Sequence, residues 1–132
     1  MPGAARGDGG RVMAALRQAD IRRLCLRLPG ASENIQWGED RVFKVGGKMF
    51  CCSGIEDDSC YSFKVDEERF LELTDQPGIR PAPYLARAKW VQIEPARCEL
   101  PAAELRALIE RSFELVAARL PKKTRRALGL PD

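Results

Sequence analysis

Hydrophobic and polar residues alternate through the middle of the chain, which is the pattern of strands with one buried face. The clearest example is a pair of short apolar runs, Val42–Val45 and Lys48–Cys52, joined by Gly46 and Gly47. Glycine reaches positive φ at no steric cost, and both central positions of the favoured two-residue hairpin turn require positive φ. The sequence therefore predicts a β-hairpin over these two runs.

The length of this turn also predicts which residues face each other across the hairpin. A two-residue link places Lys44 opposite Met49 and Phe43 opposite Phe50. Side chains alternate between the two faces of a sheet. We therefore expect the two phenylalanines on the buried face and Lys44 and Met49 on the other face.

Three further segments have the length and composition of strands. Asn34–Trp37 is short and is followed by a glycine, Cys60–Val65 alternates with its aromatic residues on one face, and Lys89–Ile93 ends shortly before a proline. The stretch Pro77–Pro83 contains three prolines and a glycine. Because these residues interrupt regular structure, a loop is predicted there.

Two helices are predicted from capping residues that precede apolar residues at helical spacing. Asp20 is expected to cap a first helix, which Pro29 and Gly30 end. Asp66 is expected to cap a short helix after the Cys60–Val65 strand, because two glutamates follow it in the first turn. Both helices therefore begin at an aspartate.

A long helix is predicted near the C-terminus. It begins at Pro101, since proline is favoured in the first turn. Its apolar face is expected to pack on the core and consists of Leu105, Leu108, Ile109, Phe113, Val116 and Leu120. A short basic helical segment is expected within Lys122–Leu130.

This order of elements predicts an α+β fold with a single antiparallel sheet and the helices packed on one face. One domain is expected over residues 18–130, and 1–17 is interpreted as a flexible tail or an extension of the first helix. No run of about 18 apolar residues is present, so the sequence predicts no membrane span.

The 132 residues include no histidine, which narrows the possible chemistry. Ser-His-Asp and Cys-His catalysis and histidine-ligated metals are excluded together. The odd number of cysteines and the absence of an apolar signal segment favour reduced thiols in the cytoplasm. We interpret these thiols as small core residues and expect no metal, no cofactor and no catalytic residue. The cysteines are Cys25, Cys51, Cys52, Cys60 and Cys98.

Three segments carry a resemblance to a known family. They are Leu24–Ala31, the hairpin Val42–Phe50, and Trp90-Val91 followed by the long helix and Leu120–Lys123. On these residues the chain resembles the MmcQ/YjbR family, whose bacterial members have been described as DNA-binding proteins. The resemblance implies a fold related to bacterial frataxin (CyaY-like) and implies no enzymatic activity. Many members have a histidine-rich segment where this chain has Tyr84–Lys89, so a histidine-dependent function is not expected here.

The sheet face opposite the helices is the first candidate binding surface. It is expected to show Lys44, Met49, Ser62, Lys64, Trp90 and Gln92. A tryptophan exposed among lysines suits nucleic acid, because phosphates accept the charge and the ring stacks on a base. The alternative is an amphipathic face covered by a loop or by a partner, with Trp90 half-buried.

Cations outside the sheet complete the candidate site. The basic run Arg119–Arg126 contains no acid, and three cations lie around the proline-rich loop, namely Arg80, Arg87 and Lys89. The alternatives are a solvated helix end and an edge strand kept soluble by its charges. The candidate DNA-binding residues are Lys44, Lys64, Arg87, Lys89, Trp90, Lys122, Lys123, Arg125 and Arg126.

Sequence-tolerant DNA binding through a basic surface is the function that these features favour. A protein-interaction or dimerising module that uses the open sheet face is the alternative, and an enzyme with an unknown substrate ranks last. The net charge is +3, which fits DNA as a partner and does not require it. A monomer or weak homodimer is expected.

Overall fold

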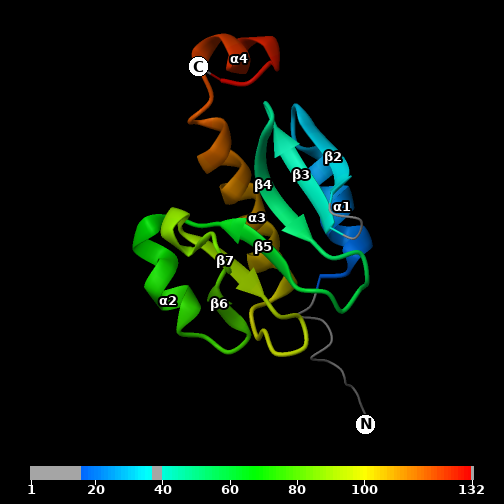
Figure 1. The fold of residues 1–132 in the computed structure, drawn as a ribbon, viewed down its shortest axis with the longest axis vertical. Helices are drawn as coiled ribbons and strands as arrows, with labels where there is room; N and C mark the ends of the chain where they lie inside the picture. Colours follow the sequence, from blue (N-terminus) through cyan, green and yellow to red (C-terminus); the bar gives the residue numbers. More distant parts are fainter. Residues whose placement is uncertain (1–15, 37–39, 132) are drawn as a thin grey trace.

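A six-stranded antiparallel sheet forms the centre of the computed structural model, which describes residues 16–36 and 40–131 (Figure 1). The strand order is β2-β3-β4-β5-β7-β6, so β7 inserts between β5 and β6. The bounds are β2 Ala31–Gln36, β3 Asp40–Val45, β4 Lys48–Ser53, β5 Tyr61–Lys64, β6 Ile79–Pro81 and β7 Trp90–Ile93.

Two helices, α1 and α3, lie behind the sheet in Figure 1 and pack against each other. The short α2 contacts β6 and β7, and α4 follows α3 at the C-terminal end. The predicted α+β fold, with one antiparallel sheet and helices, is therefore confirmed. The helical bounds are α1 Gln18–Arg27, η2 Glu67–Arg69, α2 Phe70–Thr74, η3 Ala86–Ala88, α3 Ala102–Ala117 and α4 Lys122–Ala127, where η denotes a 3₁₀ turn.

The apolar face of α3 provides much of the core, as its spacing predicts. All six residues of the predicted apolar face are buried, and the ring of Phe113 meets that of Phe50 edge to face at 5.3 Å between centroids. On the sheet side, Phe43, Phe63 and Ile93 have no exposed surface. Helical and strand periodicities therefore point into the same core.

Ser112 is the polar exception on this face of α3. Its hydroxyl accepts a hydrogen bond from the Lys64 N–H at 2.9 Å and donates one to the Phe50 carbonyl at 2.6 Å. The strands β4 and β5 pair at Cys51 and Phe63, so Phe50 and Lys64 would form the next pair. The serine hydroxyl bridges these two backbone groups where the strands diverge, and α3 is visible between them in Figure 1.

The hairpin turn forms as predicted. Gly46 and Gly47 have φ values of +58° and +81°. Gly46 also lies against the chain after α3, because a Cβ at this position would approach the Leu120 Cδ1 to 2.8 Å and the Thr124 Cγ2 to 3.2 Å. Glycine is therefore required both for the turn and for this close approach.

The hairpin register agrees with the prediction at one pair and differs at the next. Lys44 pairs with Met49 as expected, but Phe43 pairs with Cys51, so the expected Phe43–Phe50 pair is wrong. A bulge between Phe43 and Lys44 gives β4 one extra residue. Phe50 and Cys51 are both fully buried, and the length of the turn does not predict this packing.

The first helix begins before its predicted cap. It starts at Gln18, and the Asp20 carboxylate lies in its first turn, where it accepts the Arg17 N–H at 3.1 Å. Asp57, in the distant acidic turn, accepts the Gln18 N–H at 3.1 Å. Asp20 therefore contributes half of a capping box rather than the N-cap.

The first fifteen residues of the predicted segment 1–17 lie outside the described residues. Trp37, the last residue of the predicted strand Asn34–Trp37, lies outside them as well. Leu16 is buried in the core and Arg17 has an extended backbone. Neither residue lies within α1, and the interpretation of 1–17 as a tail or a helix extension stays a prediction. The buried Leu16 holds the chain against the core directly before α1.

Two other predicted elements differ in detail. Within the predicted loop Pro77–Pro83, Ile79–Pro81 form the edge strand β6. An edge strand tolerates proline because one side of its ladder is unpaired. Asp66 precedes η2, as expected, but its side chain makes no capping hydrogen bond. It instead accepts two bonds from Arg111 of α3, both at 2.9 Å, which hold the pKa of this carboxyl below its usual range.

Replacing Ser112 by alanine is expected to destabilise the fold by about 1–3 kcal/mol, because the Lys64 N–H and the Phe50 carbonyl lose their partner. Chemical denaturation measures the free energy of unfolding. Ser32→Ala, at an exposed strand position, is the matched control and should change it by less than about 0.5 kcal/mol. Equal values for Ser112→Ala and wild type would contradict the bridging role.

Candidate nucleic-acid interface

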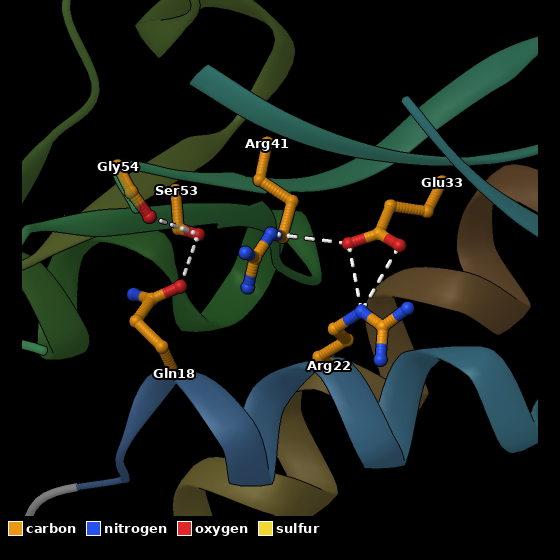
Figure 2. A network of polar contacts seen from close by, with 6 residues as sticks. All are labelled: Gln18, Arg22, Glu33, Arg41, Ser53 and Gly54. Carbon is orange, nitrogen blue, oxygen red and sulfur yellow. Dashed lines mark hydrogen bonds and ion pairs between the residues drawn. The ribbon is translucent and has the colours of Figure 1, made fainter. Parts of the chain in front are cut away.

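Acidic residues neutralise the cations between α1 and the sheet. Figure 2 shows Glu33, whose two carboxylate oxygens each lie 3.0 Å from the Arg22 Nε. The same carboxylate lies 3.0 Å from the Arg41 Nε, and beside it the Ser53 hydroxyl donates to the Gln18 amide oxygen at 3.0 Å. This side of the molecule therefore contains paired charges.

Four other arginines on the helices and their connections have similar partners. Arg111 bonds to Asp66 and Glu114, and Arg69 contacts Glu72 and Glu104. Further pairs are Arg23–Asp20 and Arg97–Glu94. A paired cation offers little net charge to an anionic partner, so these arginines are poor candidates for phosphate contacts.

A different arrangement surrounds the C-terminal end of α3. A pocket of about 300 Å³ opens there between α3 and the strand ends. No acid lines it, and in the described part of the chain its three cations form no ion pair. Its lining residues are Lys48, Lys64, Ala88, Trp90, Val116, Arg119, Leu120 and Pro121.

Lys64 is the centre of this positive charge. Its ammonium donates a hydrogen bond to the Ala88 carbonyl. Burial lowers the pKa of Lys64, and the charge of Arg119 lowers it further; Lys89 adds to this decrease, whereas Glu67 opposes it. The fold therefore holds like charges close together, an arrangement that a bound anion would relieve.

Lys89 is fixed by its backbone as well as its side chain. It has φ of +65°, its carbonyl accepts the Val65 N–H at 2.9 Å, and its ammonium lies 5.1 Å from the centroid of the Phe70 ring. A left-handed backbone is uncommon for lysine and is maintained here by these neighbours. Lys89 is thus held beside two residues that line the pocket, Ala88 and Trp90.

Trp90 lies on the predicted face, since it pairs with Lys64, but the expectation that it is exposed is wrong. It is 5% exposed. Its carbonyl accepts the Ala82 N–H at 3.0 Å and its N–H donates to the Leu85 carbonyl at 3.2 Å, so the preceding loop folds back onto β7. Ser62, also expected on the open face, is buried as well. Alternation predicts the face but not what covers it.

Among the described residues, Tyr84 is the fully exposed aromatic residue, and it is not one of the sequence candidates. Its side chain is fully exposed and its φ is +66°. It lies between Arg80 and Arg87, both exposed. The only signal in the sequence is its place in a proline-rich segment between two arginines, because residues outside strands have no alternation to interpret.

The C-terminal cations divide into two kinds. Lys122 and Lys123 are exposed in the first turn of α4. Arg125 instead points back to α3, where its Nη1 donates to the carbonyls of Ala118 (3.2 Å) and Leu120 (2.5 Å). Arg125 therefore satisfies carbonyls at the end of α3. Arg126 is exposed in the last turn of α4.

The structure thus brings together some of the candidate residues and adds others. Lys64, Lys89 and Trp90 lie around the pocket, and Lys48 and Arg119, which are not among the sequence candidates, join them. Lys44 lies half-buried on β3, two strands from Lys64, and Arg87 lies exposed in η3. Neither of these two lines the pocket.

The model of the YjbR family matches residues 26–115, more than half of the chain. This chain belongs to the YjbR family. The matched residues include the hairpin, Lys64 and Trp90, and they end before Arg119 and α4. The match thus covers the whole sheet of this YjbR protein, whereas most of α1, all of α4 and part of the unpaired positive charge lie beyond it.

The solved structures to which this chain is similar include the following two. The Deinococcus radiodurans protein DR2400, with the domain DUF419, is 32% identical over 92% of both chains, with a TM-score of 0.77. A Pseudomonas syringae protein is 21% identical over 76% of this chain and 98% of its own, with a TM-score of 0.63, which shows the fold alone. A comparison with curated proteins finds no match. None of the described helices is long and apolar enough to cross a membrane.

The buried position of Trp90 changes the expected effect of its replacement. Trp90→Ala should lower the free energy of unfolding by about 3–5 kcal/mol, because it leaves a large cavity beside β7. Thermal or chemical denaturation measures this loss. Tyr84→Ala is the control at an exposed aromatic residue and should melt close to wild type. A Trp90→Ala protein as stable as wild type would show that the ring contributes no packing.

Proposed function

We propose that this YjbR protein binds DNA with little sequence preference, through the cations around the pocket and the first turn of α4. One observation carries the proposal. Arg22 and Arg23 of α1, Arg41 of β3 and Arg111 of α3 have acidic partners. Within the described residues, no ion pair is formed by the cations at the far end of α3, which are Lys48, Lys64, Arg119, Lys122 and Lys123. Unpaired cations that share one end of the fold supply the attraction on which nonspecific DNA binding depends.

The mutual repulsion of these cations supports the same proposal. Lys64 lies close enough to Arg119 and Lys89 for their charges to lower its pKa. A phosphate between such groups would replace repulsion with attraction and would raise the pKa of Lys64 again. Binding should therefore depend strongly on salt, because each phosphate contact releases counterions from the DNA.

Tyr84 supports a preference for unpaired bases. Its ring is fully exposed on the loop that continues into Arg87 and Lys89. Exposed aromatic rings beside cations bind single strands by stacking, at about 1–3 kcal/mol for each base. Duplex DNA keeps its bases stacked on each other, so Tyr84 should matter more for single-stranded DNA.

Fluorescence anisotropy with labelled single- and double-stranded DNA tests this function. At about 50 mM salt we expect binding at micromolar protein or below, and weakening as salt rises. The double variant Lys122→Gln/Lys123→Gln and the single variant Arg119→Gln should each bind more weakly and show a smaller salt slope, by about one for each phosphate contact removed. Tyr84→Ala should weaken binding to single strands selectively.

Arg106→Gln provides the matched control. Arg106 is exposed on α3, about 16 Å along the helix axis from the end of α3 at Ala117, and its replacement removes the same charge. Its affinity should stay near that of wild type. The proposal would be overturned if neither single-stranded nor double-stranded DNA bound at low salt. A stable dimer in sedimentation experiments would then favour the alternative, a protein-interaction or dimerising module. An equal loss for Arg106→Gln and Arg119→Gln would show that only net charge matters.

A further inference from the structure

The pocket at the end of α3 has apolar walls that the proposed DNA binding does not need. Its walls are apolar, from β7, η3, α3 and the chain that follows α3, and its cations are the only charged residues among those that line it. A phosphate backbone needs cations on an open surface and gains nothing from an apolar wall. The apolar wall residues are Ala88, Trp90, Val116, Leu120 and Pro121.

The burial of Trp90 makes this difference sharper. Only 5% of its surface remains exposed, so a base has no ring face on which to stack. A small molecule in the pocket would instead contact aliphatic side chains and the small part of Trp90 that remains exposed. The volume of about 300 Å³ lies at the lower end of the range for small-molecule sites, roughly 300–1,000 Å³.

The cations at this pocket retain hydrogen-bonding capacity. An ammonium carries three N–H donors, and Lys64 spends one on the Ala88 carbonyl. The exposed Arg119 guanidinium makes no hydrogen bond or ion pair within the described residues, so its fork of donors is available to a carboxylate, sulfonate or phosphate oxygen. Lys48, exposed at the start of β4, adds a third charge.

We propose that this pocket binds a small organic anion, an apolar ring system that carries one acidic group. The ring enters the apolar walls, and the acidic group lies between Lys64 and Arg119. This site goes beyond the proposed DNA binding, although it shares Lys64 and Arg119 with that surface, and the sulfonate titration itself is carried out without DNA. Both halves of the ligand should contribute to its affinity, because the apolar walls contact the rings and the cations bind the acidic group.

The probe is 8-anilinonaphthalene-1-sulfonate, an aromatic sulfonate whose fluorescence rises on binding. A titration of the full chain should saturate at one site. N-phenyl-1-naphthylamine has the same rings without the sulfonate and should bind more weakly. Lys64→Met and Arg119→Met, which keep the apolar stem and remove the charge, should each weaken binding of the sulfonate on the order of tenfold, the effect of one charge-assisted hydrogen bond.

Two variants make the test specific to this pocket. Arg106→Met removes an equivalent charge elsewhere on α3 and should leave the titration unchanged. Ala88→Leu keeps every cation but fills the pocket, so it should abolish sulfonate binding while DNA binding persists. A thermal melt of each variant shows whether it is folded, and the exposed position of Arg119 keeps that variant informative even if Lys64→Met unfolds.

The outcomes separate this site from the proposed function. The proposed binding site would be overturned if Arg119→Met or Ala88→Leu bound the sulfonate as tightly as wild type. It would also be overturned if wild type showed no saturable binding. Loss of sulfonate binding in Ala88→Leu with normal DNA binding would support it. A protein that binds the sulfonate in this way but no DNA would retain the pocket and lose the DNA proposal.

Discussion

The hydroxyl of Ser112 holds the two halves of the sheet to α3, and much of the fold depends on this contact. Where β4 and β5 diverge, one side chain satisfies a carbonyl from one strand and an N–H from the other. Without it, two backbone groups within the protein would lack partners, which costs more than the hydrogen bonds themselves contribute. The position of α3 is therefore coupled to the place where β4 and β5 separate.

This contact also determines what lies at the end of the helix. One turn after Ser112 comes Val116, and the chain then presents Arg119, Leu120 and Pro121 to the pocket. Since Lys64 N–H bonds to Ser112, the strand that carries Lys64 and the helix that leads to Arg119 are fixed relative to each other. The concentration of positive charge follows from backbone hydrogen bonding rather than from the overall composition.

Sequence patterns predicted the parts of the fold that depend on neighbours along the chain. The glycine turn and the buried face of α3 follow from local periodicity, and both are present. The bulge at Phe50 and the edge strand Ile79–Pro81 depend on packing between distant segments, which alternation does not contain.

The candidate site was predictable to a smaller extent. Lys64 and Trp90 were correctly assigned to one face, but the burial of Trp90 results from a loop that folds back by backbone hydrogen bonds. Arg119 joins Lys64 only through the course of α3, and Tyr84 is displayed by a left-handed backbone in a loop. Periodicity describes the faces of regular elements, and these properties arise where elements end.

Gly46 connects the most recognisable motif of the chain to its most basic helix. Gly46 leaves no room for a side chain, because Leu120 and Thr124 occupy that space, whereas Gly47 beside it faces open space. A larger residue at Gly46 would have to push aside the side chain of Leu120, which lies two residues before α4 and its first-turn cations Lys122 and Lys123. The hairpin glycine thus acts as a spacer next to the C-terminal cations, although it carries no charge and lies more than seventy positions earlier in the chain.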